Sequence, residues 1–488
     1  MDEKDKEIMS KEYVNNTEEI NQDKINEKNE NKMGIMPVNR LLLSMSLPMM
    51  ISMLVQAAYN VVDSIFVAKV SENALTAVSL AFPIQSLLIA VGAGTGVGMN
   101  AVLSKALGEK NVDKANKTAV NGVFLAVIGY VLFVLVGILA VKPFYSFQLA
   151  GGTMNEATRQ EIYRYGVDYL TICCVCSVGV LVQMTFERLL QSTGKTLLSM
   201  CTQLAGAIVN IVLDPILIFG LLGFPRMEAA GAAVATVVGQ IVAAVMGIVL
   251  NIMFNKEIHI SLKGFRPDFS IIKKVYSVGI PSIIMQAIGS VMVFGMNKIL
   301  MVFSSTAAAV FGVYFKLQSF VFMPVFGLNN GMVPIIAFNY GAGKRERLIK
   351  TIKLSILYAV VIMLAGFMVL QIFPVPLLKL FDASDNMLDI GVTALRTISY
   401  SFVFAGYCIV AGSVFQALGN GMYSLLVSVL RQMIVLLPVA YLFGKWFGLE
   451  QVWMAFPIAE LMSLAASTVF LVRIYKKVIR HIGAELQN

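Results

Sequence analysis

Few strongly polar side chains interrupt the apolar stretch from residue 43 to residue 68. Gln56, Asn60 and Asp63 recur at helical spacing and therefore share one face, with Tyr59 beside them. The stretch is longer than the roughly 20 apolar residues that a helix needs to span a bilayer. Placing a carboxylate inside such a helix costs about 3 kcal/mol or more of free energy, so the carboxylate usually has a function and faces a cavity or a partner. We therefore predict that Asp63 belongs to an ion or proton site.

A second polar pair lies in the apolar stretch 197–221. Asn210 and Asp214 are four residues apart on one helical face, and Pro215 follows at once. Because proline has no N–H to donate, the helix can bend there and leave a backbone carbonyl free beside the carboxylate. Asp214 could instead pair with a basic residue and only hold helices together. The first six apolar stretches contain no Lys or Arg at that depth, which favours a functional carboxylate.

Asp63, Asp214 and Thr236 are predicted to lie at a similar depth in the membrane. At about 1.5 Å per residue from the predicted inner ends, Asp63 and Asp214 reach the outer half of the membrane, and Thr236 descends to that level from outside. Two carboxylates brought together in a medium of low dielectric constant cannot both stay charged cheaply, so they share a proton or a cation. We predict that Asp63, Asn210 and Asp214 bind either H⁺ or Na⁺.

The composition is that of a polytopic membrane protein, with 57% hydrophobic and 14% charged residues in a chain of 488. Soluble domains hold roughly 25% charged residues. Loop Lys and Arg residues number 21 on one side of the membrane and 7 on the other, so the positive-inside rule predicts that both termini are cytoplasmic. The net charge of +9 is thereby attributed to loops facing anionic lipid, and no nucleic-acid partner is predicted. Apolar runs predict twelve transmembrane helices, at about 41–68, 75–103, 118–141, 163–186, 197–221, 229–254, 275–302, 307–338, 354–373, 391–415, 423–443 and 451–472.

An internal repeat divides the chain into halves. A shift of 233 residues superposes Pro48 on Pro281, Gly98 on Gly331 and Gly108 on Gly341. Later segments repeat at a shift of 225. Each half has an even number of spans, so the halves enter the membrane in the same sense. The predicted fold is an all-α polytopic membrane protein, with twelve transmembrane helices in two six-helix lobes related by a pseudo-two-fold axis along the membrane normal. The expected parts are a disordered cytoplasmic tail 1–38, an N-terminal lobe 39–254, a cytoplasmic linker 255–274, a C-terminal lobe 275–473 and a cytoplasmic tail 474–488.

Several other features have plain structural explanations. Glycines at 92, 94, 96 and 98 form small-xxx-small pairs that let helices approach closely. The five cysteines lie in apolar segments and are expected to pack there, and the two histidines lie in polar loop or tail sequence. Glu187 and Arg188 are expected to form an interfacial pair. Lys316 could position cationic cargo or pair with an acid such as Glu460, and both interpretations stay open.

A substrate cavity between the lobes is expected, because adaptable Met and aromatic side chains suit varied cargo. Pro48 and Pro215 are the expected hinges. The residues expected to line the cavity are Gln56, Asn60, Met53, Gln183, Met184, Gln286 and Lys316.

The residues discussed above resemble those of the multidrug and toxic compound extrusion (MATE) transporters over about residues 38 to 475. The resemblance is closest to the DinF-type branch, because 275–302 and 391–415 contain no carboxylate. It implies a V-shaped two-lobe antiporter that expels cationic amphipathic compounds against entering H⁺ or Na⁺. It also implies that Asp63, Asn210 and Asp214 occupy coupling positions, with Tyr59 and Thr236 as partial matches. The motifs that carry the resemblance are Pro48, Gln56, Tyr59-Asn60 and Asp63; Asn210-x-x-x-Asp214-Pro215; Gly231-Ala232-Ala233-x-Ala235-Thr236; and Trp453-x-Ala455-x-Pro457-x-x-Glu460.

The predicted function is secondary active export of small cationic drug-like compounds in exchange for H⁺ or Na⁺. The protein is expected to lie in the cytoplasmic membrane as a monomer and to need no cofactor beyond the coupling ion. The alternative is a flippase or exporter of a lipid-linked or other native metabolite, which would want a cationic cavity. An enzyme is not expected, because the predicted spans contain no set of metal ligands and no Ser/His pair.

Overall fold

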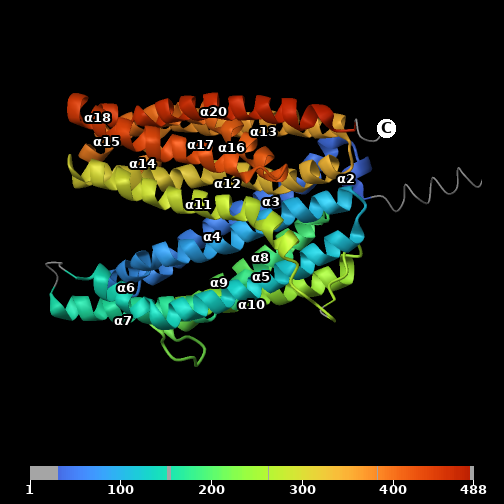
Figure 1. Ribbon diagram of the computed structural model, residues 1–488. Helices are drawn as coiled ribbons and strands as arrows, with labels where there is room; N and C mark the ends of the chain where they lie inside the picture. Colours follow the sequence, from blue (N-terminus) through green and yellow to red (C-terminus); the bar gives the residue numbers. More distant parts are fainter. Residues whose placement is uncertain (1–30, 151–154, 262, 382, 484–488) are drawn as a thin grey trace, which may run out of the picture.

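The computed structural model describes residues 31–150, 155–261, 263–381 and 383–483. Throughout these residues the regular structure is helical (Figure 1). Within this described part, ten helices are long and apolar enough to cross a membrane, and counting each of two bent helix pairs as one span brings the number to twelve. The predicted all-α, twelve-helix fold class is therefore confirmed.

The first lobe contains α3 (Val38–Ala68), α4 (Glu72–Gly108), α5 (Val112–Leu139), the pair α7 (Glu156–Val175) and α8 (Val178–Ser192), α9 (Thr196–Phe219) and α10 (Glu228–Phe254). The second contains α11 (Phe269–Met301), α12 (Ser305–Gly341), α13 (Arg345–Ile372), the pair α15 (Asp385–Ser399) and α16 (Phe402–Ala417), the span α17 (Gly421–Val429), π-helix Leu430–Leu436 and α18 (Leu437–Phe447), and α20 (Ala455–Lys477). The short helices are α2 (Lys32–Ile35), α6 (Val141–Gln148), α14 (Pro374–Lys379), α19 (Leu449–Val452) and the 3₁₀ turn Ile479–His481.

The internal repeat extends to local structure. Ser71 caps α4 by accepting a hydrogen bond from the amide of Ala74 at 3.0 Å, and Ser304, 233 residues later, caps α12 in the same way at 3.0 Å. The fourth span of each half is bent, by 44° between α7 and α8 and by 49° between α15 and α16. The sequence had predicted each of these spans as one continuous helix.

Close backbone approaches between the lobes follow the pseudo-two-fold axis. A Cβ atom added at Gly94 of α4 would lie 2.5 Å from the Ile283 side chain of α11. A Cβ atom added at Gly327 of α12 would lie 2.5 Å from Cα of Met50 on α3. Gly327 and Ile283 are the repeat counterparts of Gly94 and Met50 at the shift of 233. The same pair of contacts is thus made twice, and glycine is required because no side chain fits between the backbones.

The expected role of the glycines at 92 to 98 is confirmed by their surroundings. Gly94 and Gly98 face α11 of the second lobe, whereas Gly92 and Gly96 face Met184 and Arg188 of α8. Helix α4 is therefore packed closely on two sides.

The lobes lie together at the end of the molecule that carries α2 and the last described residues, and they separate toward the other end (Figure 1). The second lobe has one continuous apolar core. The core of the first lobe is divided into separate clusters, one around Tyr145 and Ile218 and another around Leu103 and Leu189. A third, smaller apolar cluster surrounds Phe133 and Leu181.

Residues 31–36 form an ordered segment, here called the N-terminal strap, which joins the two lobes at their closed end. On the side of the first lobe, Asn31 donates from Nδ2 to the carbonyl of Thr193 at 3.3 Å and also to Glu257. On the side of the second lobe, Asn339 donates to the carbonyl of Met33 at 3.1 Å. Arg347 donates to the carbonyl of Met36 at 2.7 Å.

The predicted disordered tail 1–38 extends too far, because residues 31–36 are ordered in the strap. Met33 is 0% exposed, and α3 already begins at Val38, so one buried apolar side chain and several hydrogen bonds order this part. Residues 1–30 of that predicted tail lie outside the described residues. The predicted linker 255–274 becomes helical at Phe269, and the predicted tail 474–488 begins inside α20, with its last five residues outside the described part.

Candidate functional site

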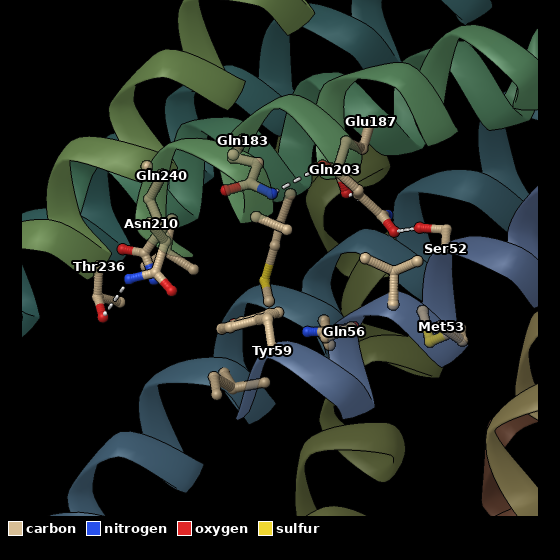
Figure 2. Close-up of a pocket in the computed structure, with 18 of the residues that line it drawn as sticks. Ser52, Met53, Gln56, Tyr59, Gln183, Glu187, Gln203, Asn210, Thr236 and Gln240 are labelled. Atoms are coloured by element: carbon tan, nitrogen blue, oxygen red, sulfur yellow. Dashed lines mark hydrogen bonds between the residues drawn. The ribbon is translucent and has the colours of Figure 1, made fainter. Parts of the chain in front are cut away.

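A cavity of about 210 Å³ lies in the first lobe between α3, α8, α9 and α10 (Figure 2). Its lining combines apolar and polar side chains, including Met53, Gln56, Tyr59, Gln183 and Met184. Four of them were predicted from the sequence to line a cavity, whereas Tyr59 was predicted as a coupling residue. Polar residues gather at its two ends, with Asn210 and Thr236 at one end and Glu187, Gln203 and Ser52 at the other (Figure 2).

The structure brings together the three residues predicted on α9 and α10. Asn210 donates from Nδ2 to Oδ1 of Asp214 at 3.3 Å and lies 3.3 Å from Oγ1 of Thr236. Asp214 is 0% exposed. Asp63 on α3 is half-buried. Hydrogen bonds therefore link Asn210 to both Asp214 and Thr236 at one end of the cavity.

Three oxygen atoms of this group are buried, and within the described residues they have no hydrogen-bond partner. They are Oδ1 of Asp63, Oδ1 of Asn210 and Oδ2 of Asp214. A buried acceptor without a donor costs free energy, so it is expected only where a proton or cation can satisfy it. Carboxylate and amide oxygens are ligands for hard cations as well as sites for protons. The described part of the chain contains no group of three or more His, Cys, Asp or Glu side chains that could hold a metal ion.

Tyr59 connects this group to the cavity. Tyr59 lines the cavity and lies four residues before Asp63 on α3, so the two side chains share one face of that helix. Asp63 and Asp214 themselves are not among the described lining residues. The carboxylates therefore lie behind the cavity wall, and Tyr59, Asn210 and Thr236 stand between them and the cavity.

Three residues predicted to line the cavity lie elsewhere. Asn60 and Gln286 are exposed on α3 and α11, and the ammonium group of Lys316 lies 5.7 Å from the centre of the Phe381 ring. None of the three is among the described lining residues. The cavity is formed within the first lobe, so side chains of α11 and α12 that face the space between the lobes do not reach it.

The possible pairing of Lys316 with Glu460 is not the one that forms. Glu460 instead pairs with Arg431, with 3.3 Å between Nη1 and Oε2. Arg431 lies in the π-helix 430–436, whose extra residue per turn changes which side chains face α20. Sequence spacing could not reveal that change.

The two predicted hinge prolines lie inside continuous helices. Pro48 is buried in α3, and Pro215 lies in α9 one residue after Asp214. Proline cannot donate to the carbonyl of residue 211, so α9 lacks one hydrogen bond beside the carboxylate.

The expected interfacial pair of Glu187 and Arg188 does not form. Arg188 turns toward the second lobe and donates to Oε1 of Gln191 at 2.8 Å and to Oδ1 of Asn330 at 3.0 Å. Glu187 turns into the first lobe, where Gln183 donates to it at 2.8 Å and Gln203 at 2.7 Å. Neighbouring residues on a helix diverge by about 100°, which is why they point in different directions. The spacing of Gln183 and Glu187, four residues apart, was the signal that the sequence interpretation missed.

Comparison with known proteins identifies the family. The MatE family profile matches residues 48–216 and 281–442, which cover most of both lobes. The chain belongs to the MatE family. It is therefore a multi-pass membrane transporter and not an enzyme, and the resemblance to MATE transporters inferred from the motifs is confirmed.

Curated relatives in this family match nearly the whole chain. The multidrug export protein MepA of Staphylococcus aureus is 28% identical over 435 residues, covering 88% of this chain and 93% of the relative. A protein of Shewanella oneidensis named FAD transporter is 27% identical over 429 residues, covering 87% and 92%. Relatives of this MATE protein thus include exporters of drugs and a transporter of a flavin nucleotide.

Solved MATE structures share the fold. A multidrug resistance MATE family transporter in an outward-facing conformation matches with a TM-score of 0.84 at 25% identity, covering 92% of this chain and 98% of that chain. A MATE protein in complex with MaL6 matches with a TM-score of 0.83 at 24% identity, covering 92% and 100%.

Proposed function

We propose that this MATE protein is a secondary active exporter of small cationic amphipathic compounds, which it exchanges for H⁺ or Na⁺. The observation that carries the proposal is the fully buried Asp214. One of its oxygens has no hydrogen-bond partner among the described residues, and the other accepts from Asn210 at one end of a first-lobe cavity. The proposed coupling residues are Asp63, Asn210 and Asp214, and Tyr59 and Thr236 are proposed to assist them. Their location in the first lobe supports assignment to the DinF-type branch.

The proposed mechanism follows from charge. When the two carboxylates hold no proton or Na⁺, their negative charge favours a cationic guest in the adjacent cavity. Entry of H⁺ or Na⁺ neutralises part of that charge and weakens the hold on the guest. Movement of one lobe against the other then exposes the cavity alternately to each side of the membrane. Pro48 of α3 and Pro215 of α9 are the proposed points of bending.

The proposed setting is the cytoplasmic membrane, with both termini in the cytoplasm, where the excess of loop Lys and Arg supports this orientation. In that orientation the closed end of the lobes faces the cytoplasm, and the structure represents an outward-facing state. The protein is proposed to work as a monomer with no cofactor other than its coupling ion and with no nucleic-acid partner.

The test is ethidium efflux from proteoliposomes with a pH gradient or a Na⁺ gradient imposed in turn. Asp63→Asn and Asp214→Asn should each abolish gradient-driven efflux while the protein remains folded in the membrane. Asp113→Asn is the matched control, because Asp113 is exposed and forms an ion pair with Lys117 at the surface. Full gradient-driven efflux by Asp63→Asn would end the proposal.

A second candidate is export of a native flavin nucleotide, favoured by the relative named FAD transporter and by Arg188, a cation that borders the cavity. This candidate is a specific case of the alternative predicted from the sequence, which was export of a lipid-linked or other native metabolite. Gradient-driven movement of FAD in the same proteoliposomes, without ethidium movement, would favour this candidate.

A further inference from the structure

Glu187 is a buried carboxylate of the first lobe that does not belong to the proposed ion site. It lies on α8, is 5% exposed and borders the cavity at the end away from Asn210 and Thr236 (Figure 2). Ser52 of α3 lies at the same end, whereas Asp63 lies eleven residues further along α3, which is about 16 Å at the helical rise. Glu187 is therefore separated from the coupling carboxylates by the length of the cavity.

Neutral donors fix the position of the Glu187 carboxylate. Gln183 donates to Oε1 at 2.8 Å, Thr202 donates to the same oxygen at 3.3 Å, and Gln203 donates to Oε2 at 2.7 Å. The amide oxygen of Gln203 in turn accepts from the hydroxyl of Ser52. Donors without charge orient and stabilise an ionised carboxylate but leave its negative charge uncancelled. The site is thus built around an anion held jointly by α3, α8 and α9.

The adjacent cation is engaged elsewhere. Arg188 points its guanidinium at Gln191 and at Asn330 of α12. Its charge still acts on Glu187, but among the described residues no ion pair joins the two side chains. The carboxylate therefore keeps the capacity to bind a cation that enters the cavity.

The rest of the wall suits the apolar part of such a cation. Met53 and Met184 offer flexible thioethers, and Tyr59 offers an aromatic face that attracts cations. The volume of about 210 Å³ is below the roughly 300–1,000 Å³ of pockets that enclose a drug-sized ligand. The cavity in this state therefore holds only part of the cargo. Its lining is best suited to a positively charged group placed near Glu187.

We propose that the Glu187 carboxylate is the counter-ion for the cationic group of the cargo, at a site distinct from the ion-coupling group of Asp63, Asn210 and Asp214. This inference rests on the proposed function. It assigns charge recognition to α8 and ion coupling to α3 and α9. Loss of Glu187 should therefore lower cargo affinity, whereas loss of Asp63 should uncouple exchange.

The experiment measures ethidium binding to the purified full chain in lipid nanodiscs by fluorescence anisotropy. Glu187→Gln should raise the Kd for ethidium at least tenfold, and Glu187→Asp, which keeps the charge, should recover most of the affinity. Glu109→Gln is the matched control, because it removes a first-lobe carboxylate that pairs with Lys114 at the surface, and it should bind ethidium like the wild type. An unchanged Kd in Glu187→Gln, or equal losses in the Gln and Asp variants, would overturn the proposal.

A comparison of ligands keeps the test decisive if Glu187→Gln fails to fold. Wild-type protein should bind ethidium at least tenfold more tightly than dihydroethidium, its uncharged reduced analogue, and equal affinities would refute a counter-ion. The two proposals fail separately. A wild-type protein that moves no ethidium under either gradient contradicts the proposed function. Gradient-driven efflux by the wild type, with an unchanged KM for ethidium in Glu187→Gln, contradicts only the role of Glu187.

Discussion

Substitution of Gly327 by alanine tests the way in which α12 approaches α3 at the interface between the lobes. The added Cβ atom would lie 2.5 Å from Cα of Met50 and 2.6 Å from its amide nitrogen. The shorter distance is 0.9 Å less than the 3.4 Å of an ordinary contact. Backbone atoms cannot evade this overlap by changing rotamer, so the helices must move apart. Overpacking of this kind costs about 1–3 kcal/mol, whereas the gain in helix propensity from Gly to Ala, about 1 kcal/mol, is the same whether or not α12 touches α3.

The cost of about 1–3 kcal/mol therefore falls on the state in which these helices touch. Since about 1.4 kcal/mol corresponds to a tenfold change in an equilibrium constant, Gly327→Ala should shift the ratio of closed to open forms at the α2 end roughly tenfold toward open. Gly94→Ala, at the repeat-related position, should act in the same direction. Spin labels at exposed Asp113 and Lys350 would report the shift as a longer distance in double electron–electron resonance.

Gly312→Ala is the control, because Gly312 lies on the same helix α12 and an added Cβ atom would meet nothing within 4 Å. Its distance distribution should match the wild type. If Gly327→Ala and Gly312→Ala give the same distribution, the reasoning about reciprocal glycine contacts is refuted.

Three further predictions concern the strap and the second lobe. Arg347→Ala should release the N-terminal strap, because each lost hydrogen bond from a charged donor is worth about 1.5–3 kcal/mol; amide hydrogen exchange in the strap should rise at least tenfold, and unchanged exchange would contradict the assignment. Arg431→Met should destabilise the protein by about 3–5 kcal/mol, because Glu460 is left buried without its cation; a variant that also carries Glu460→Met should recover most of the loss in thermal unfolding. Burial raises the pKa of Glu257 above its ordinary value of 4.5, so the folded protein binds this proton more tightly than the unfolded chain. The contribution of Glu257 to stability is therefore fully present below pH 4.5 and lost as the pH rises through the raised pKa; Glu257→Gln should flatten that dependence in thermal melts, and an unchanged slope would exclude Glu257 as its origin.

Much of the fold could be predicted from the sequence. Apolar runs long enough to span a bilayer, loop charges and the repeat at 233 residues were sufficient for twelve helices in two lobes, because lipid forces each span to satisfy its own backbone hydrogen bonds. The grouping of Asn210, Asp214 and Thr236 also followed, since depth in the membrane is a simple function of position along a straight helix.

Other features depended on the tertiary structure. The separation of Glu187 from Arg188, the pairing of Arg431 with Glu460 and the order of the N-terminal strap all involve side chains that meet partners from distant parts of the chain. A bend, a π-helix or a rotation of a helix about its axis changes such partners without changing the hydrophobic pattern. The sequence by itself therefore determined the helices, the repeat and the pairing of Asn210 with Asp214. Only the tertiary structure decided which lobe holds the cavity and which acid faces it, because those depend on how the helices turn toward one another.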